Sequence, residues 1–463
     1  MTLLLQSFTQ QTLDMSKIDS RPSRRGLFIL EETARCRAAS SRRLRERERN
    51  KRYTFGDQWS DLVTVDGTTM TEETFIRQSE NQPPLKNNII RRIVRNVLGV
   101  GRETLAKRTD LGRHDTETFA RAMEEFLIGG VAVCHVWLGN RNGVKGCHID
   151  LVSPSNFFFD PYARDFQGED ITGIGETHNV GFDELCAAFA TDRHSYDRLR
   201  RIFPPEQTSR CNVVQYWRRE RRPCHIVNDT DHGTVEFLDP DTFDRLSPRM
   251  PSHWRTAWRV TDTWRYYFLS PEGHIIAEGD SPYPDGSHPY IFKAYPFIDG
   301  ETHSFVGDLI DQQRYTNRLI TLYDWIMRAS AKGVLLFPED SLPPHADRQL
   351  LINEWSRHNG VIFYSPKPGD PLPQQISSNA TNIGITELLQ IQLRMMEDVS
   401  GVNGALQGKL DARSVSGTLY ESQTRNAMTA LRDLLDSFDS FVDAALGRRL
   451  TVAGPHLSSS LGT

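Results

Sequence analysis

The chain has 463 residues, a formal net charge of −5, 38% hydrophobic residues and 10% aromatic residues. The aromatic content excludes a wholly disordered chain, and the acidic balance argues against tight DNA wrapping, although DNA could still pass without being held. The longest nearly apolar run, GGVAVCHVWLG, is about half of a membrane span. No basic-apolar secretion signal opens the chain, so we expect a soluble protein that is not exported by this route.

Six cysteines are scattered through the first half of the chain without a CxxC pair, which is typical of reduced thiols in a cytosolic setting. Cys147, His148, Cys224 and His225 could in principle share a zinc ion, but they lack the spacing of a zinc finger. We expect these residues to be ordinary core or surface residues, with no metal and no other cofactor bound.

Helices are expected in the first third of the chain. Residues 1–27 are polar and are expected to form a flexible arm, and Arg and Glu at helical spacing predict a helix over 28–52. The Arg-rich part, 42–52, could face DNA, the capsid or only water. Tyr53, Phe55 and Trp59 are expected to anchor this helix to a core.

Two more helices follow. One begins after Pro83 and Pro84 and has an apolar stripe from Ile89 to Leu98. The next ends at Gly129 and Gly130, which is a typical C-terminal stop signal.

From residue 131 to about 300 the pattern indicates strands. NRNG, residues 140–143, lies between two apolar segments and predicts a hairpin. Another pair of strands is expected around Pro271–Gly273, and one helical insert is expected over 182–203. VVQYWRRE is predicted to be a further strand.

The second half changes to long helices. Periodic apolar residues predict a helix from 307 to about 333, a returning helix over 383–399 and a third helix over 414–446. A proline-fenced insert, 334–376, separates the first two helices and contains two short strands around a short helix. The final residues are expected to be frayed.

The sequence contains no GxxxxGK[ST], HExxH or GxSxG motif, so we predict no catalytic residue and no enzymatic activity. The alternative hypothesis is a metal-dependent nucleic-acid-processing enzyme that uses Asp160, Asp165 and Asp170. Pro161 favours a turn there, and acids in turns more often cap backbone groups. A generic oligomeric scaffold is a third hypothesis.

The order of elements after residue 300 resembles the portal proteins of tailed double-stranded DNA bacteriophages. GDLIDQQRYTNRL is similar to the segment that enters the stem of a portal, and VSGVNGALQGK followed by SVSGTLYESQTRNAMTALRDLLDSFD is similar to the end of the stem, the tunnel loop and the next helix. RYTFGDQW, KNNIIRRIVRNVLG and LVSPSNFFFDPYARDFQGED are similar to portal wing segments. The resemblance covers about residues 45–446.

The resemblance implies an α+β portal fold with antiparallel stem helices, an α/β clip insert, a long channel-lining helix and a small or absent crown. The implied parts are an arm (1–27), a wing (28–306), stem helix 1 (307–333), a clip (334–376), stem helix 2 (377–400), a tunnel loop (401–413), a long wing or channel helix (414–446) and a short C-terminal tail or vestigial crown (447–463).

The resemblance also assigns residues to these parts. The tunnel-loop contacts with DNA would come from Gln407, Lys409, Arg413 and Ser414, and the freedom of the loop from Gly401, Gly404, Gly408 and Gly417. Stem packing would use Tyr323, Trp325, Ile326, Met395 and Met396. A clip docking surface would use Glu354, Arg357, His358 and Lys367.

The implied function is a ring, a dodecamer in this family, that conducts DNA through one capsid vertex during packaging and ejection. The implied partners are further copies of the chain, sliding double-stranded DNA, the terminase large subunit, a head–tail adaptor protein, and the major capsid and scaffolding proteins, with no membrane. The implied location is the virion, after assembly in the host cytoplasm.

Overall fold

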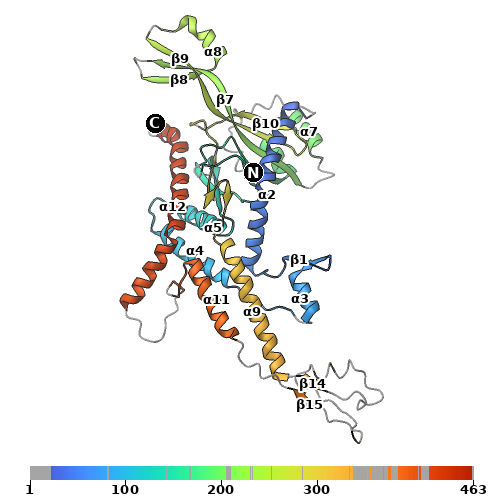
Figure 1. Cartoon of the computed structure of the whole chain (residues 1–463). Helices are drawn as coiled ribbons and strands as arrows, with labels where there is room; N and C mark the ends of the chain where they lie inside the picture. The colour runs from blue at the N-terminus through green and yellow to red at the C-terminus, as the bar shows by residue number, and fades with distance from the viewer. Residues whose placement is uncertain are drawn as a thin grey trace. The chain divides into compact units, whose positions relative to one another are not determined.

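The computed structural model describes residues 22–80, 83–141, 144–165, 168–204, 210–229, 231, 233–251, 253–283, 285–332, 334–336, 352, 355, 369, 374–376, 384–404, 406–407 and 417–460. It is an α+β structure in which long helices accompany antiparallel sheets (Figure 1). The chain divides into two compact units, and each is described by itself. The first unit contains Met1–Phe55, Ile90–Ile310 and Ser400–Thr463, and the second contains Gly56–Ile89 and Asp311–Val399.

A six-stranded antiparallel sheet is the largest element of the first unit. Its order is β10-β9-β7-β6-β5, with β8 paired to the far end of β7. The strands are β5 (Phe157–Phe159), β6 (Gly173–Gly181), β7 (Arg210–Asp229), β8 (Thr234–Leu238), β9 (Trp254–Leu269) and β10 (Ile275–Asp280).

Both faces of this sheet are covered where β7 lies at its centre. Val213 and Trp217 belong to one hydrophobic cluster with α6 (Phe182–Phe189) and α7 (Arg193–Ile202). Val214 and Tyr216 point to the opposite face and pack with Ile29 of α2 (Arg24–Phe55). Because successive side chains of a strand point to opposite faces, β7 contributes residues to two separate hydrophobic clusters, one on each face of the sheet.

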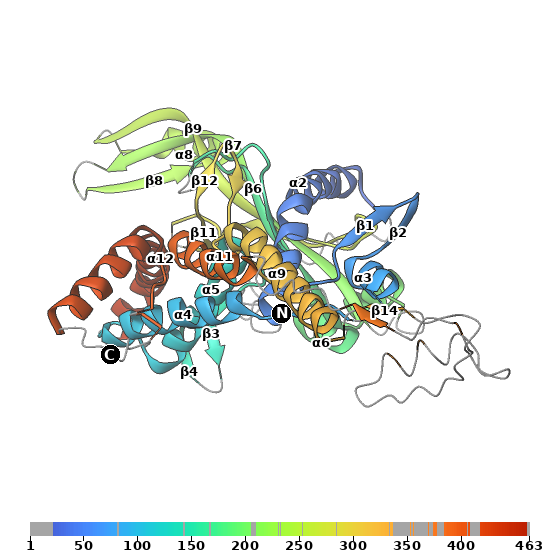
Figure 2. The same ribbon diagram turned by 60° about the horizontal axis from the view of Figure 1, so that its bottom comes forward.

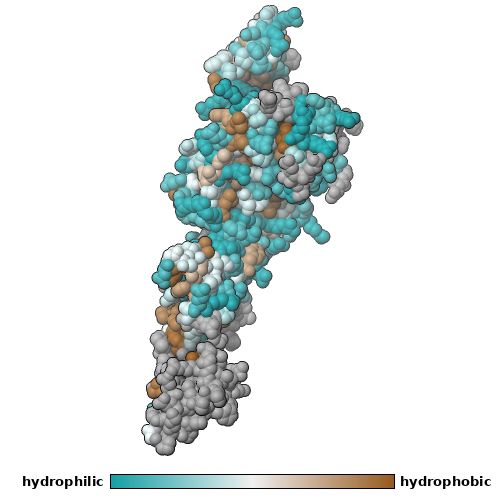
Figure 3. All heavy atoms as spheres, turned by 90° about the vertical axis from the view of Figure 1, so that its right-hand side faces the viewer, coloured by the Kyte–Doolittle hydropathy of each residue, from teal (hydrophilic) through white to brown (hydrophobic). Residues whose placement is uncertain are grey.

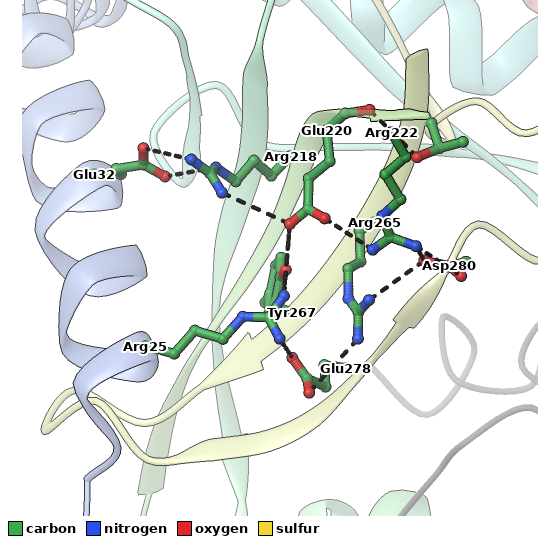
Figure 4. Close-up of polar contacts among 10 residues, drawn as sticks. Arg25, Glu32, Arg218, Glu220, Arg222, Arg265, Tyr267, Glu278 and Asp280 are labelled. Atoms are coloured by element: carbon green, nitrogen blue, oxygen red, sulfur yellow. Dashed lines mark hydrogen bonds and ion pairs between the residues drawn. The ribbon is translucent and has the colours of Figure 1, made fainter. Parts of the chain in front are cut away.

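A network of charged side chains fixes the start of α2 to the second face of the sheet (Figure 4). Arg25 donates to the Tyr267 hydroxyl at 2.6 Å, and this hydroxyl donates to Glu220 at 2.7 Å. Burial and the adjacent Glu220 carboxylate raise the pKa of Tyr267, so the hydroxyl stays protonated as a donor. The other members of the network, which extend it across β7, β9 and β10, are Glu32, Arg218, Arg222, Arg265, Glu278 and Asp280.

A three-stranded sheet of order β11-β3-β4 completes the strand part of the first unit. β3 (Val131–Arg141) and β4 (Val144–Leu151) form the hairpin predicted around NRNG, and β11 (Tyr290–Ala294) pairs with the other edge of β3. The chain reaches β3 from α5 (Arg113–Gly129), which ends at Gly130 in the left-handed conformation, as predicted. α4 (Ile89–Lys107) buries the predicted apolar stripe.

The last helix, α12 (Gly417–Ser460), packs against this sheet and α5. Phe441 stands edge-on to Phe119, with ring centres 6.0 Å apart, and Phe438 lies 5.6 Å from Phe126. Ion pairs reinforce this contact: Arg449 lies 2.7 Å from Asp115, and Asp443 lies 2.6 Å from Arg108. The smaller elements of the unit are α8 (Pro240–Leu246), a 3-10 turn η2 (Ser247–Arg249), β12 (Phe297–Ile298) and β13 (Glu301–Thr302).

The second unit consists of the hairpin β1 (Leu62–Val65) and β2 (Thr68–Thr71), α3 (Glu72–Glu80), most of α9 (Gly307–Lys332), the paired strands β14 (Val334–Leu336) and β15 (Gln374–Ile376), and α11 (Ile385–Ser400). Figure 2 views the same elements after a turn about the horizontal axis. The helices predicted at 307–333 and 383–399 are confirmed within one or two residues.

Three expectations need correction. The predicted insert at 182–203 is two helices, because Asp192 caps a second start by accepting from the Ser195 amide at 2.7 Å. Phe55 is 56% exposed and is not part of a core, and its ring instead lies under the Arg91 guanidinium at 4.6 Å, whereas Tyr53 is fully buried. The last helix does not end at 446: Val452 is buried in the core, and α12 continues to Ser460, through residues expected to be frayed.

Two histidines in the strand part of the first unit, the buried His135 and the half-buried His288, have no carboxylate partner among the described residues. The ring of His288 stands edge-on to Trp264 at 4.6 Å, and burial lowers its pKa to about 4. Burial also lowers the pKa of His135, on β3, well below its ordinary value. Both rings are therefore held neutral in the folded chain.

The stability of the protein should fall as the pH drops below the ordinary histidine pKa of about 6.5. The folded pKa of His288 is depressed, so its contribution is complete above that value and decreases as the unfolded chain takes up the proton. We expect this one ring to cost about 1–2 kcal/mol at pH 5. Thermal unfolding between pH 7 and 5 would measure the slope, which His288→Gln should make shallower. The exposed His194 provides the control, since His194→Gln should leave the slope as in wild type.

Candidate functional site

One side of α9 is a row of buried polar side chains, which we call the amide seam: Gln313, Asn317 and Thr321, each 3% exposed or less. Their spacing of four residues places them on one helix face. The Gln313 carbonyl oxygen accepts from the Ile89 amide at 3.0 Å, and its amino group donates to the Asn87 carbonyl at 2.6 Å. The seam therefore supplies hydrogen-bond partners for the backbone just before α4, where the chain has no secondary structure of its own.

Asn317 is the centre of the seam. Its carbonyl oxygen accepts from the Asn87 amide at 3.1 Å and from Gln313 at 3.0 Å, and its amino group donates to Gln58 at 2.7 Å. One turn later, the Thr321 hydroxyl accepts from the Leu85 amide at 3.1 Å. A spacing of four residues in the sequence places Gln313 and Asn317 on one helix face, but it does not identify their partners, which lie more than 200 residues away.

Beside the seam, a buried carboxylate joins α9 to α3. Glu72 is 4% exposed, and it lies 3.2 Å from Arg314 and 2.5 Å from Arg318. Two guanidinium groups therefore compensate one desolvated carboxylate. Arg314 and Arg318 are four residues apart, which is the only signal of this site in the sequence.

Whereas α9 carries buried polar side chains, α11 carries an exposed apolar stripe. Its members are between 42% and 50% exposed, and they follow one another at intervals of three and four residues: Leu388, Ile391, Met395 and Val399. On α9, the exposed large apolar side chains are Tyr315, Leu322, Tyr323 and Met327. Figure 3 shows several hydrophobic patches on one face of the molecule.

The predicted stem-packing residues divide between buried and exposed positions. Met396 is 1% exposed, whereas Met395 and Tyr323 are 46% and 42% exposed. Trp325 and Ile326 are half-buried. The five residues thus do not form one core within the chain, and their exposed members remain available to another surface.

The chain leaves α11 through an ordered turn. Gly401 has a φ of +67°, and a Cβ added there would lie 3.0 Å from the Cβ of Ala430. Val402 is fully buried, the Asn403 side chain accepts from the Leu406 amide at 3.2 Å, and Gln407 donates to the Val402 carbonyl at 3.1 Å. Gly401 is thus required for ending a helix close to α12, and not only for motion.

Only some of the other predicted loop and clip residues are described by the structure. Gln407 is half-buried, Gly404 lies in the turn, and Gly417 begins α12. The following residues lie outside the described residues: Glu354, Arg357, His358, Lys367, Gly408, Lys409, Arg413 and Ser414. Their assignments remain predictions.

Some arginines in the Arg-rich part of α2 are turned toward the protein. Arg47 is 6% exposed, and it contacts Glu125 at 2.6 Å and Ser155 at 2.8 Å. The Arg43 guanidinium stacks on Phe159 at 4.9 Å, and burial lowers its pKa to about 10. Arg42 is exposed but pairs with acids. Arg42, Arg43 and Arg47 are therefore explained by the fold of one chain.

The three acids proposed as an enzymatic centre act as caps of one loop. Asp160 accepts from the Tyr162 amide at 2.9 Å and from Thr172, and Asp170 accepts from the Arg164 and Asp165 amides at 2.6 and 3.1 Å. Asp165 accepts from the Glu169 amide at 2.9 Å. All three carboxylates are thus used by backbone groups, which gives the enzyme hypothesis no support.

The alternative zinc site is not formed either, because Cys147 lies on β4 and Cys224 on β7 of different sheets. Across the described ranges, no group of three or more potential ligands could hold a metal ion. Nor does any described helix have the length and hydropathy of a membrane span.

These features are those of a structural protein built on long helices. A family model described as phage P22-like portal protein matches residues 110–448, and the chain belongs to this family. The protein is a phage portal protein, the head–tail connector that serves DNA packaging at the capsid vertex. The family is structural rather than enzymatic, and it forms homo-oligomers with capsid, terminase and tail partners in general. A search of curated proteins finds no match.

The amide seam predicts a large effect of a single substitution. Asn317→Leu would leave the Asn87 amide and the Gln58 side chain without their bonds, and we expect it to lower the free energy of unfolding by about 2–4 kcal/mol. Thermal unfolding measures the loss, and hydrogen exchange should become faster at residues 85–89. Asp311→Ala, at an exposed position of the same helix, is the control and should change little. Unaltered exchange at 85–89 in the Asn317 variant would show that the seam does not hold this segment.

Proposed function

We propose that the protein acts as a closed ring, by analogy with its family a dodecamer, which forms through head-to-tail contacts between its stem helices. The observation that carries this proposal is the exposed apolar stripe on α11. Four large apolar side chains on one face of a helix are costly to leave in water, at about 25 cal/mol per Å² of apolar surface. A neighbouring copy can bury them, and a head-to-tail contact that closes on itself forms a ring.

In this proposal the parts have the roles expected from the family. Residues 28–306 form the wing, 307–333 and 377–400 the stem, and 334–376 the clip. The loop 401–413 faces the channel, where Gln407, Lys409, Arg413 and Ser414 would contact the DNA backbone weakly. Sparse basic contacts suit a channel through which DNA must slide, because each phosphate contact adds affinity and therefore resistance.

The clip is proposed to dock the terminase large subunit and later the head–tail adaptor, through Glu354, Arg357, His358 and Lys367. The wing would face the major capsid and scaffolding proteins. The ring would be assembled in the host cytoplasm and remain at the portal vertex of the virion.

Ile391→Glu tests the ring interface. Ile391 is 47% exposed, so the substitution should leave the chain folded but place a charge in the proposed contact between copies. Native mass spectrometry should show a closed ring for the wild-type protein and monomers or small oligomers for the variant. Gln390→Glu adds the same charge beside the stripe and should retain the ring. Rings of normal size in the Ile391 variant would exclude the stripe as the interface, and a wild-type monomer at near-physiological salt would contradict the ring itself.

A second test concerns the tunnel loop. Lys409→Ala combined with Arg413→Ala should alter DNA packaging or retention and leave ring assembly and melting temperature unchanged, since both side chains are proposed to contact only DNA. Shortening 404–413 should impair packaging in the same way. In-vitro packaging and native mass, measured on the same samples, separate the effects. A sharp fall in melting temperature or a loss of rings would show that the loop is a structural element.

A further inference from the structure

The far end of the six-stranded sheet is a narrow extension, which we call the tip: residues 223–229 of β7, β8, α8 and residues 254–263 of β9 (Figures 1 and 2). β6 pairs with β7 only as far as Arg218, and β10 pairs with β9 only as far as Arg265. Beyond these points the two central strands continue with β8 as the one additional strand among the described residues. The tip therefore has little around it to bury its surfaces.

One edge of the tip is a strand without a neighbour. β7 occupies one side of β9, and on the other side the last backbone contact is the Ser281 amide with the Trp264 carbonyl at 2.9 Å. From Arg255 to Thr263 the described residues supply no strand on that side. This segment is about 30 Å of unpaired amide and carbonyl groups at 3.3 Å per residue. Natural proteins usually cover or shorten such an edge.

The side chains of this edge differ between its two faces. Trp258 and Val260, on one face, are 61% and 52% exposed. That face also carries His225, opposite Trp258, whose ring is stacked at 3.7 Å on Phe243 of α8. The side of the tip where α8 packs therefore ends in a row of uncovered apolar groups.

The opposite face carries two arginines. Arg255 and Arg259 are exposed and stand on either side of Ala257, four residues apart, which is about 13 Å along a strand. In the part of the chain that the structure describes, neither side chain makes a hydrogen bond or an ion pair. They differ in this from Arg218, Arg222 and Arg265 lower on the same sheet, all of which have acidic partners.

We propose that the free edge of β9 takes up an extended segment of another protein as an added strand, with acidic side chains on one face and apolar ones on the other. Backbone bonds along Arg255–Thr263 would supply the affinity, as in other cases of strand addition. Acids four residues apart would face Arg255 and Arg259, and apolar side chains would cover Trp258 and Val260. Aromatic and arginine side chains are those that contribute most to protein interfaces.

This chemistry favours a protein segment over nucleic acid. A phosphate backbone could pair with the two arginines, but it would leave the backbone edge unpaired and the tryptophan exposed. The charge pattern also favours a partner other than this chain, since both unpaired groups are basic and need acids at a defined spacing. The inference does not depend on the proposed ring contact, which involves α11.

The test uses the full-length protein and a synthetic peptide, TVEVAVEVT, which places two glutamates four residues apart on one face of a strand and valines on the other. We expect binding by fluorescence anisotropy, and protection of the amides of 255–263 from hydrogen exchange. The lysine analogue TVKVAVKVT should bind at least tenfold more weakly. Arg255→Glu with Arg259→Glu should reverse this preference.

Arg249→Glu is the matched control, because Arg249 is an exposed arginine of η2, which follows α8 and lies off the edge, and its reversal should leave binding unchanged. Arg255→Gln with Arg259→Gln, a milder pair, should weaken binding of the glutamate peptide without reversing the preference. Equal affinity of the two peptides, equal loss in the Arg249 variant, or protection outside 255–263 would overturn the proposal. If the amides of 255–263 became protected without peptide as the protein concentration rose, the occupant would be a second copy of the chain. If duplex DNA displaced the peptide and protected the same amides equally, the occupant would be nucleic acid.

Discussion

The amide seam of α9 is the constraint on which the second unit depends. The segment that enters α4 has no regular structure before Ile89, so its backbone groups have no partners within a helix or strand of their own. Side chains of α9 supply those partners at Leu85, Asn87 and Ile89. A buried amide left unpaired costs about 1–3 kcal/mol, so the helix and the segment have to be ordered together. The polar side of α9 is thus committed within the chain, and only its remaining surface is available for contact with other molecules.

α9 and α11 also carry large apolar residues that the described part of the chain does not bury. On α9 these include Leu322 and Tyr323, and α11 buries Ile385 and Met396 while Leu388, Ile391, Met395 and Val399 stay in contact with water. Such a stripe is an unfavourable surface for a monomer, but it is an ordinary interface for an assembly. Membership of the portal family and this incomplete burial therefore point to the same requirement for further copies.

The sequence predicts the long helices well, because their apolar periodicity is local and their ends carry glycine or proline signals. It predicts the hairpin at NRNG for the same reason. It does not predict the partners of Gln313, Asn317 and Glu72, since these contacts join residues more than 200 positions apart. The sequence also predicts too short a last helix, with an end at residue 446 just before Gly447. In the structure, Val452 is buried in the core and α12 continues to Ser460. Tertiary packing outweighs local propensity there.

The arginines show why composition alone says little about DNA contact. Arg47, Arg218 and Arg449 each pair with a carboxylate at 3.1 Å or less, so they stabilise the fold and contribute little to an external field. Arginines that are neutralised in this way offer few strong phosphate contacts, which is compatible with a conduit for sliding DNA. On the six-stranded sheet, Arg218, Arg222 and Arg265 each pair with an acid. Arg255 and Arg259, further along the same sheet, form no ion pair among the described residues, and they lie on a strand edge that also lacks a partner. An added strand with acids at their spacing would satisfy the charges and the backbone together.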